Sequence, residues 1–290
     1  MAEDESAHTP ALTVVRDVPS LRRRVQAMRA AGKTVGFVPT MGALHAGHLS
    51  LVDRAQKLAD AVIVSIFVNP TQFGPDEDLA SYPRKDAEDW EVLSAAGIDL
   101  LFMPDADVMY PHGFQTVVRV PGVSQGLCGA ARPGHFDGVA TVVAKLLLQV
   151  LPDYALFGEK DYQQLAVIQR LVTDLNVPVD IVGAPTVREG DGLALSSRNA
   201  YLTEDERKIA PALYRTLKTV AGDIAKGEDA AGCCEAAVAA LEAAGFSSVE
   251  YVEVRDAETL AENPAPDRPR RVLAAAHLGK ARLIDNVPVP

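Results

Sequence analysis

The sequence predicts an α/β protein in which a doubly wound parallel sheet is followed by a smaller α+β domain. Short apolar segments alternate with amphipathic segments of helical period as far as residue 185, and this alternation is typical of parallel strands joined by right-handed helical crossovers. The segment 61–68, AVIVSIFV, is apolar throughout, as expected for a strand that is covered on both faces. Near residue 186 the sequence becomes polar and rich in glycine, which predicts a domain boundary.

The first domain is predicted from strands and helices that follow one another along the chain. The first helix is expected at 19–33, where apolar residues recur on one face, Ser20 is the expected N-cap and Gly32 ends the helix. The other strands and helices are expected, in chain order, at 34–40, 48–59, 61–68, 84–97, 98–104, 139–151, 153–158, 161–175 and 179–185. Sheets built in this way are Rossmann-like, and they bind ligands beyond the carboxyl ends of their strands.

The second domain is predicted from a different pattern. Thr203 and Glu206 have the spacing of a capping box at the start of a helix, and an alanine-rich helix is expected at 230–245. A small sheet is expected from the segments 249–256, 270–279 and 281–289. We therefore divide the chain into a Rossmann-like domain of residues 1–185 and a smaller α+β domain of residues 186–290 that acts as a lid.

Composition and charge restrict the class of protein. The 290 residues carry a formal net charge of −11, which disfavours a general affinity for nucleic acid or for an anionic membrane. Cys128, Cys233 and Cys234 have the spacing of neither a disulfide framework nor a metal site. The first ten residues are acidic and polar, unlike a targeting segment, and no apolar stretch approaches the roughly 18 residues of a membrane helix. We therefore expect a cytoplasmic protein without nucleic-acid or membrane partners.

The segment 39–48, PTMGALHAGH, places two histidines just after a predicted strand. Unpaired N–H groups at the start of the following helix favour anions, and Gly42 and Gly47 allow a ligand to approach the backbone. His45 and His48 lie three residues apart, so both rings can face the first helical turn and donate hydrogen bonds to a phosphate. The segment therefore predicts a nucleotide phosphate site. Two alternatives stay open: histidines of an exposed loop, and a metal site, although helical zinc pairs are usually four residues apart.

Residues 45–48, HAGH, resemble the HxGH motif of the nucleotidylyltransferase superfamily, which includes the class I aminoacyl-tRNA synthetases. In that superfamily a second loop, written KMSKS in the synthetases, holds the phosphates. The segment 193–199, LALSSRN, is the candidate for that loop here. Ser196 and Ser197 are its candidate donors, and Arg198 is its candidate cation.

Four longer segments resemble the pantothenate synthetase (pantoate–beta-alanine ligase) family, and they occur in the family's order at 38–52, 64–84, 157–165 and 185–199. The resemblance continues into the second domain through VEYVEVRD and ARLIDN. It implies an ATP-dependent condensation of pantoate with beta-alanine through a pantoyl-adenylate intermediate, with release of AMP and pyrophosphate. It also implies Mg²⁺ that enters as the ATP chelate, and a homodimer, for which the apolar stretch 116–120 is a candidate edge strand.

The resemblance implies roles for individual residues. The catalytic residues are His45, His48 and Lys160, with Lys160 as a mobile positive charge for phosphate. Gln72 and Gln164 are implied to bind pantoate, and Gln72 also beta-alanine; neutral amides suit a substrate that has hydroxyl and carboxylate groups. The implied ATP-binding residues are Met41, Gly42, Ala43, Leu44, His45, Ala46, Gly47, His48, Gly158, Glu159, Lys160, Asp161, Val187, Leu195, Ser196, Ser197 and Arg198.

Some side chains near these motifs have two interpretations. Lys160 is either a phosphate ligand or one end of a surface ion pair with Glu159 or Asp161. Phe157 is a candidate to pack the dimethyl group of pantoate. Asn69 is either a ligand contact or the cap of a turn.

Two acidic clusters are candidates for a metal site, but we interpret both as solvent-exposed. One is predicted to be a solvated loop and consists of Asp76, Glu77 and Asp78. The other is predicted to be the charged face of a helix and consists of Asp86, Glu88 and Asp89. His135 is expected in a glycine-rich loop, and the sequence assigns it no role.

Other functions fit the same motifs less well. A nucleotidylyltransferase of this fold would keep the nucleotide on its product and release pyrophosphate without AMP, and it would leave Gln72 and Gln164 without a purpose. A tRNA synthetase core is disfavoured by the negative charge and by the lack of an anticodon-binding extension. A non-catalytic ATP sensor would not need Lys160 and the 193–199 loop together with the histidines.

Overall fold

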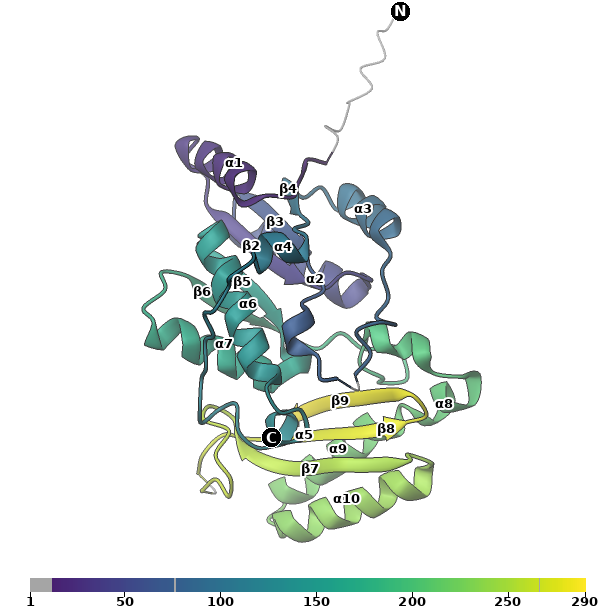
Figure 1. The fold of residues 1–290 in the computed structure, drawn as a ribbon. Helices are drawn as coiled ribbons and strands as arrows, with labels where there is room; N and C mark the ends of the chain where they lie inside the picture. The colour runs from purple at the N-terminus through teal and green to yellow at the C-terminus, as the bar shows by residue number, and fades with distance from the viewer. Residues whose placement is uncertain (1–11, 76, 266) are drawn as a thin grey trace, which may run out of the picture.

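The computed structural model describes residues 12–75, 77–265 and 267–290, and it confirms the predicted fold class (Figure 1). A six-stranded parallel sheet with helices on both faces is followed by a three-stranded antiparallel sheet with its own helices. The predictions for Asp76 and for the first ten residues fall outside the described residues.

The parallel sheet has the strand order β1-β4-β3-β2-β5-β6. Its strands are β1 (Val14–Val15), β2 (Val35–Thr40), β3 (Ala61–Ile66), β4 (Leu100–Phe102), β5 (Tyr154–Gly158) and β6 (Asp180–Ala184). The chain builds outward from β2, first through β3 and β4 on one side and then through β5 and β6 on the other, and these strand pairs are parallel. The carboxyl ends of β2 and β5 are therefore neighbours where the strand order reverses, which is the usual ligand site of an open α/β sheet.

Apolar side chains fill both faces of this sheet. Phe37 of β2 and Ile63 of β3 belong to the cluster on one face, and Val38 and Val64 belong to the cluster on the other. β3 is buried at every position, which confirms the strand predicted from the apolar segment. The first face is covered by α1 (Val18–Ala30), α6 (His135–Val150) and α7 (Tyr162–Asp174), and the second by α2 (Ala46–Leu58) and α3 (Asp86–Ala95).

Short elements interrupt the connections between the strands and the longer helices. They are the single turns η1 (Pro70–Gln72) and η2 (Glu159–Asp161), the longer turn η3 (Ser197–Tyr201), and the short helices α4 (Ala106–Met109) and α5 (Leu127–Ala131). η2 follows β5 directly, and η1 and η3 lie in the loops after β3 and β6. The short elements therefore gather near the carboxyl ends of the strands.

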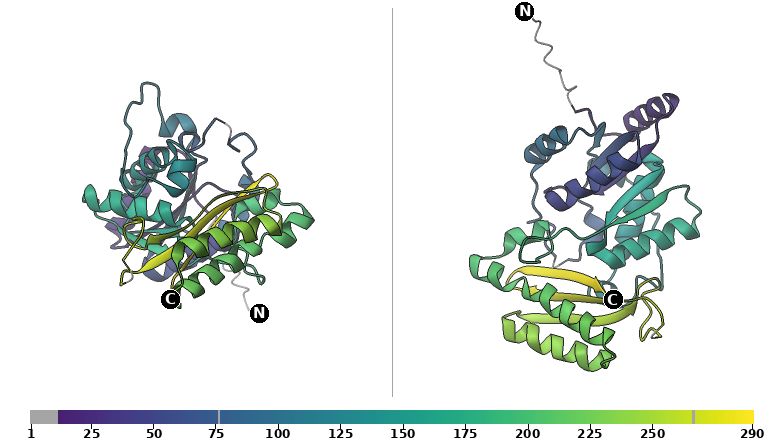
Figure 2. Two further views of the ribbon diagram at one scale, coloured as in Figure 1. Left: turned by 90° about the horizontal axis from the view of Figure 1, so that it is seen from below. Right: turned by 180° about the vertical axis from the view of Figure 1, so that it is seen from behind.

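The C-terminal unit packs beneath these carboxyl ends in the view of Figure 1. It consists of α8 (Glu204–Ile209), α9 (Ala212–Ala225), α10 (Ala230–Ala244), β7 (Ser248–Asp256), β8 (Arg270–Leu278) and β9 (Ala281–Pro288). The strands are antiparallel in the order β7-β8-β9, and α9 and α10 cover the outer face of the sheet (Figure 2). Thr203 and Glu206 form the predicted capping box of α8. The division between residues 185 and 186 stays a proposal.

Three local predictions are wrong. Asp17, not Ser20, is the N-cap of α1, because the helix starts at Val18, two residues before the predicted cap. The carboxylate of Asp17 accepts the N–H of Ser20 at 2.8 Å. The stretch 116–120 forms no strand among the described residues, since the N–H of Val118 donates to the hydroxyl of Thr141 on α6. His135 is the first residue of α6, not part of a loop.

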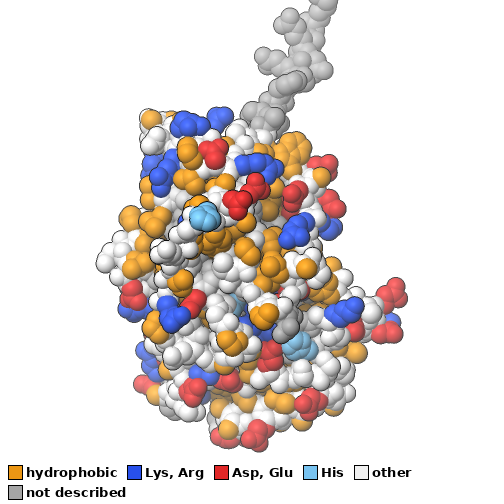
Figure 3. Space-filling model, viewed as in Figure 1, with side chains coloured by type: hydrophobic (Ala, Val, Ile, Leu, Met, Phe, Trp, Pro, Cys, Tyr) orange, Lys and Arg blue, Asp and Glu red, His pale blue; other side chains and the backbone are white. Residues whose placement is uncertain are grey.

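The surface mixes charges of both signs. Figure 3 shows acidic and basic side chains interspersed with apolar ones over one face of the molecule. Large apolar side chains that are more than half exposed include Val117, Leu148 and Leu175, and Leu151 is 50% exposed. Among the described residues, no helix is both long and apolar enough to cross a membrane.

Candidate active site

A cavity of about 220 Å³ opens where the carboxyl ends of β2 and β5 meet. Its walls come from the histidine segment after β2, from η1, from α6, from η2 and from the loop between β6 and η3. Five segments that are far apart in the sequence therefore contribute to one site, at the position predicted from the parallel sheet.

The histidine segment forms the start of α2. His45 is the N-cap, and its Nδ1 accepts the N–H of Gly47 at 3.1 Å. His48 lies at the third helical position, and its Nδ1 accepts the N–H of His45 at 3.3 Å. In a neutral imidazole the nitrogen that accepts carries no proton, so the proton of each ring is on Nε2. Both histidines line the cavity, and Nε2–H is the group that each has left to donate to a ligand.

Both histidines are held in the neutral state. Burial lowers the pKa of His45, and the nearby charge of Lys160 lowers it further. Burial lowers the pKa of His48 to about 3, assisted by His45 and Lys160. The ring centroids lie 4.1 Å apart, too close for two imidazolium charges. The pair therefore acts at neutral pH through hydrogen bonds and not through positive charge.

Gly47 and Gly42 serve the segment in different ways. A Cβ atom at Gly47 would lie 2.8 Å from Cε1 of His45, so Gly47 makes room for the histidine ring as well as for a ligand. Gly42 has a φ of +81°, a conformation that disfavours side chains. A Cβ atom there would also lie 3.0 Å from the carboxylate of Asp89.

Asp89 corrects one sequence prediction. It was expected on an exposed helical face, but it is 2% exposed, and its carboxylate accepts the N–H groups of Ala43 and Leu44 at 2.8 Å each. Burial raises the pKa of Asp89, and the two backbone hydrogen bonds oppose that effect. Ala43 adopts a positive φ of 50°. Asp89 therefore holds the bent backbone that leads into the histidines, a contact between elements that the helical pattern of α3 does not reveal.

The turn η2 carries Lys160 and Asp161 into the cavity. Lys160 takes part in none of the ion pairs found among the described residues, so the surface-pair interpretation does not apply. Lys160 lines the same cavity as both histidines, and its charge lowers the pKa of His45 and His48. Glu159 points elsewhere, since its carboxylate lies 3.7 Å from Arg271 of β8.

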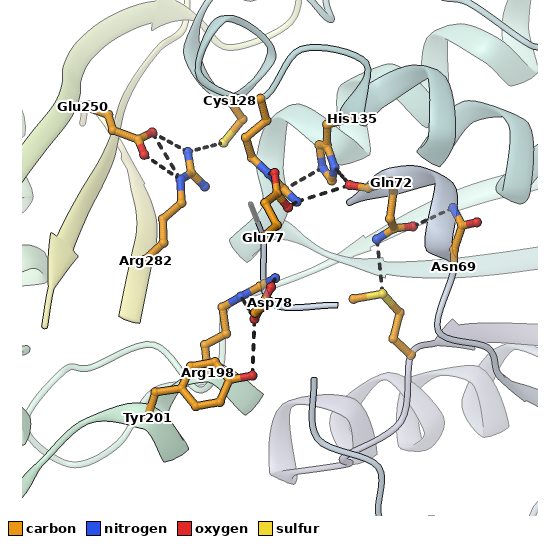
Figure 4. Close-up of polar contacts among 12 residues, drawn as sticks. Asn69, Gln72, Glu77, Asp78, Cys128, His135, Arg198, Tyr201, Glu250 and Arg282 are labelled. Carbon is orange, nitrogen blue, oxygen red and sulfur yellow. Dashed lines mark hydrogen bonds and ion pairs between the residues drawn. The ribbon is translucent and has the colours of Figure 1, made fainter. Parts of the chain in front are cut away.

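The 193–199 loop lines the cavity through Leu195, Ser196, Ser197 and Arg198, and a Cβ atom at Gly47 would lie 3.8 Å from that of Leu195. The hydroxyl of Ser196 accepts the N–H of Arg198 at 3.3 Å and caps η3, and the hydroxyl of Ser197 lies 3.2 Å from that of Tyr82. The guanidinium of Arg198 donates twice to the carboxylate of Asp78, at 2.9 and 3.0 Å (Figure 4). Burial acts to raise the pKa of Asp78, but the hydrogen bonds and charge of Arg198 outweigh it and leave the pKa lowered.

Gln72 lies at the end of η1 and is 8% exposed. Its Oε1 accepts from the amide of Asn69 at 3.0 Å, and its Nε2 contacts the sulfur of Met41 at 3.1 Å (Figure 4). Asn69 is 1% exposed and also accepts the hydroxyl of Tyr110 at 2.7 Å. Asn69 therefore caps η1, as one interpretation expected, and it also fixes which way the amide of Gln72 faces.

Arg132, paired with Glu77, and His135 hold the backbone of η1 at Gln72. Arg132 donates to the carboxylate of Glu77 and to the backbone oxygen of Gln72, and Nδ1 of His135 donates to that oxygen at 2.7 Å. Nε2 of His135 then accepts from Arg132 at 3.0 Å (Figure 4). The prediction of a solvated acidic loop is therefore wrong for Glu77 and Asp78, because each carboxylate is paired with an arginine.

Buried neutral histidines predict a loss of stability in mild acid. Burial and Arg132 lower the pKa of His135 from 6.5 to about 4, so between these pH values the unfolded chain binds a proton that the folded chain does not. The free energy of unfolding therefore falls as pH drops below about 6.5. The contribution of His135 to this fall reaches about 3 kcal/mol when the pH is below about 4. Urea unfolding at pH 7 and at pH 5 measures the change. Carboxylates whose pKa is lowered in the folded protein are ionised at both pH values. His135→Gln should show a smaller drop, and an equal drop in both proteins would contradict this account.

The two adjacent glutamines 163 and 164 have different roles. Gln163 is 4% exposed, accepts the N–H of Cys128 and donates to three backbone oxygens of residues 123–126. Gln164 lines the cavity. The sequence alone does not separate them, because both lie in the first turn of α7 and the side they face depends on packing.

An apolar wall completes the cavity. It consists of Phe67, Val139, Val142, Val143, Leu146 and Phe157. Phe157 was expected here, but the four residues of α6 were missed, because this helix is apolar on nearly every side and its pattern marks no single face. Thr40, Ser50, Tyr82 and Thr186 also line the cavity; they lie within the segments that carry the family resemblance, but no role was assigned to them there.

Most of the residues named from the sequence line this one cavity. From the ATP set these are Met41, His45, Gly47, His48, Gly158, Lys160, Asp161, Val187, Leu195, Ser196, Ser197 and Arg198, and from the pantoate set Gln72 and Gln164. The others of the ATP set do not line it: Gly42, Ala43, Leu44, Ala46 and Glu159. The N–H groups of Ala43 and Leu44 are already bound by Asp89.

Metal ligands are sparse in this part of the molecule. Among the described residues, no group of three or more His, Cys, Asp or Glu side chains could hold a metal ion. Asp161 is the one carboxylate among the described residues that line the cavity. The cysteines are free thiols.

Comparison with known proteins identifies relatives along nearly the whole chain. The family model described as pantoate-beta-alanine ligase matches residues 13–288. The chain is 62% identical over 279 residues to the pantothenate synthetase of Paramagnetospirillum magneticum, covering 96% of this chain and 98% of the relative. It is 57% identical to that of Rhodospirillum rubrum, covering 96% and 99%.

Solved structures agree with these relatives. The pantothenate synthetase of Thermus thermophilus superposes with a TM-score of 0.88 at 49% identity, covering 96% of this chain and 99% of that chain. The pantoate-beta-alanine ligase of Francisella tularensis, complexed with beta-gamma ATP and beta-alanine, has a TM-score of 0.82 at 35% identity, covering 96% and 98%.

Proposed function

Because the chain belongs to the pantoate–beta-alanine ligase family, it is a ligase that condenses pantoate with beta-alanine at the expense of ATP, and we propose that the cavity at the β2–β5 strand ends is its active site. The observation that carries this proposal is the meeting of the HAGH segment and Lys160 where the strand order reverses. The solved relative that holds a nucleotide and beta-alanine supports it.

In the first proposed step the carboxylate of pantoate attacks the α-phosphorus of ATP. A P–O bond forms to the carboxylate, the bond between the α- and β-phosphates breaks, and pyrophosphate leaves. The carboxylate is ionised at neutral pH, so the step needs alignment and charge stabilisation but no base. We assign the Nε2–H groups of His45 and His48, together with the ammonium of Lys160, to the phosphates.

Pyrophosphate is proposed to be held by the 193–199 loop. Ser196, Ser197 and Arg198 line the cavity. Arg198 is paired with Asp78 in this structure. To bind a phosphate, its guanidinium would either contact both anions or leave Asp78. Asp161, the carboxylate beside Lys160, is assigned to a hydroxyl of the ribose.

Pantoate is proposed to lie between the two glutamines and the apolar wall. Gln72 and Gln164 can both donate and accept, which suits hydroxyls beside a carboxylate. Val142, Val143 and Leu146 of α6 offer an apolar surface for the dimethyl group. We also assign beta-alanine to Gln72, next to the carbonyl that its amine must reach.

In the second proposed step the amine of beta-alanine attacks the carbonyl of the adenylate. A C–N bond forms, the bond from the carbonyl carbon to the phosphate oxygen breaks, AMP leaves, and the amine loses a proton to water or to a phosphate oxygen. Water must be excluded from the mixed anhydride meanwhile. We propose that the C-terminal unit contributes to this by covering the cavity as a lid; identical distances between the two units with and without ATP would argue against closure.

Mg²⁺ is proposed to enter as the chelate of ATP. Mg²⁺ usually keeps several waters and takes one or two protein carboxylates beside substrate phosphates. A cavity with Asp161 as its carboxylate fits such a chelate better than a metal site made by protein alone. In this form the cation would supply positive charge to the phosphates, and the assignments of His45, His48 and Lys160 stay the same.

We further propose a cytoplasmic homodimer. The proposed contact surface between the two copies is formed by the exposed apolar side chains Val117, Leu148 and Leu151. Sedimentation equilibrium at micromolar concentration tests it, and a single monomeric species would contradict it.

The function is tested by following the products of Mg-ATP, pantoate and beta-alanine by mass spectrometry while each component is omitted in turn. Equal amounts of pantothenate and AMP are expected, with pantoyl adenylate accumulating when beta-alanine is absent. Pyrophosphate without AMP would instead indicate a nucleotidylyltransferase. ATP binding without turnover would indicate a sensor.

A further inference from the structure

The turn that carries Lys160 is held from the second sheet. We propose that Asn286 of β9 is a positioning residue that sets the backbone of Lys160 and thereby the reach of its ammonium group into the cavity. This inference rests on the proposed function, because it gives Lys160 a role at the phosphates. Asn286 is the last residue of the segment ARLIDN, to which the sequence resemblance assigned no role.

The contacts of Asn286 account for its entire amide group. Nδ2 donates to the backbone oxygens of Glu159 at 2.9 Å and of Lys160 at 3.0 Å. Oδ1 accepts from Nη1 of Arg271. The reversed amide would point its oxygen at two carbonyl oxygens and its nitrogen at a guanidinium, so the orientation is fixed. Asn286 is 4% exposed, so water does not compete freely for these bonds.

Arg271 of β8 supports Asn286 in this position. Its guanidinium lies 3.9 Å above the ring of Tyr162 and 3.7 Å from the carboxylate of Glu159. It therefore contacts residues on both sides of Lys160 in the sequence. Tyr162 in turn donates its hydroxyl to the backbone oxygen of Ala257 at 2.6 Å, a second bond between this turn and the C-terminal unit.

The turn itself has few constraints of its own. η2 is a single 3-10 turn of three residues, and neither its cap nor that of α7 makes a side-chain hydrogen bond. A lysine has a flexible side chain of four carbons, so the place of its backbone decides which phosphate it can reach. A misplacement of about 1 Å can cost about 100-fold in rate. Two hydrogen bonds to consecutive carbonyls are therefore a direct means of keeping Lys160 in place.

A double-mutant cycle tests the inference. Asn286→Ala removes both donors, and Asn286→Asp keeps the shape and the contact with Arg271 but can no longer donate to the carbonyls. Both are expected to lower kcat/KM for ATP in pantoate-dependent pyrophosphate release by about 10- to 100-fold. If Asn286 acts through Lys160, adding Asn286→Ala to Lys160→Ala should cause no further loss.

A matched control separates positioning from stability. Val252→Ala trims the core from β7, at the opposite edge of the same sheet from β9, and it should lower the melting temperature without the loss in kcat/KM. Fully additive losses in the cycle would overturn the inference, as would wild-type kinetics in a folded Asn286→Asp protein. If Lys160→Ala alone retains wild-type turnover, the proposed role of Lys160 fails, and the inference fails with it. Loss in Lys160→Ala with none in the Asn286 variants would leave the proposed function intact and overturn only the positioning role.

Discussion

Replacing His48 by asparagine is expected to lower kcat for pantoate-dependent pyrophosphate release by about 10²- to 10³-fold, the usual effect of removing one donor from a developing anionic charge. Asparagine can place an acceptor near the position of Nδ1, so the bond to the N–H of His45 is kept. It does not extend to Nε2, so the donor toward the cavity is lost. Glutamine extends to Nε2 and should retain more activity than asparagine.

The pH dependence of this loss distinguishes a hydrogen bond from proton transfer. The pKa of His48 is lowered to about 3, so the ring is neutral throughout the range from about pH 6 to about pH 9. The ratio of wild-type to His48→Asn activity should therefore be constant across that range. A ratio that falls sharply near pH 6.5, the ordinary pKa of histidine, would mean that a protonated His48 takes part. The matched control is His112→Asn, an exposed histidine outside the cavity, which should leave kcat unchanged.

Replacing Asp285 by alanine is expected to lower the free energy of unfolding by about 3–5 kcal/mol, because it leaves a largely buried arginine without its partner. Both terminal nitrogens of Arg188 donate to Asp285, at 2.6 and 2.8 Å, and the guanidinium lies 3.7 Å above the ring of Tyr214. The side chain of Asp285 is 3% exposed. The pair fastens the loop after β6 to β9, so the loss should appear in the C-terminal unit.

Urea unfolding followed by circular dichroism measures this effect. Removing both partners, as Asp285→Ala with Arg188→Met, should recover much of the stability, since no buried charge then stays unpaired. Asp205→Ala removes a pair with Lys208 whose side chains are 89% and 72% exposed, and it should change the midpoint little. Equal midpoints for Asp285→Ala and Asp205→Ala would contradict this account.

Local patterns in the sequence were sufficient for most of the fold. The apolar segment of β3 and the alternation around it depend only on which side chains must leave water, and both faces of the sheet are buried as that rule requires. The capping box of Thr203 and Glu206 depends on residues within one turn. The N-cap of α1 was missed although it is local, because Asp17 and Ser20 are both good caps and only the backbone path selects one.

For the site, too, some features followed from short stretches of sequence and others from packing alone. The sequence by itself singled out the HAGH segment, through two histidines and two glycines after a predicted strand, whereas the 193–199 loop and Lys160 were predicted from the family resemblance. Residues of all three line one cavity. Only the tertiary structure decided that Asp89 is buried under the histidine segment, that the four apolar residues of α6 line the cavity, and that Asn286 holds the turn of Lys160. These contacts join residues that are distant in the chain, so their energies depend on how elements pack and leave no periodic pattern in the sequence.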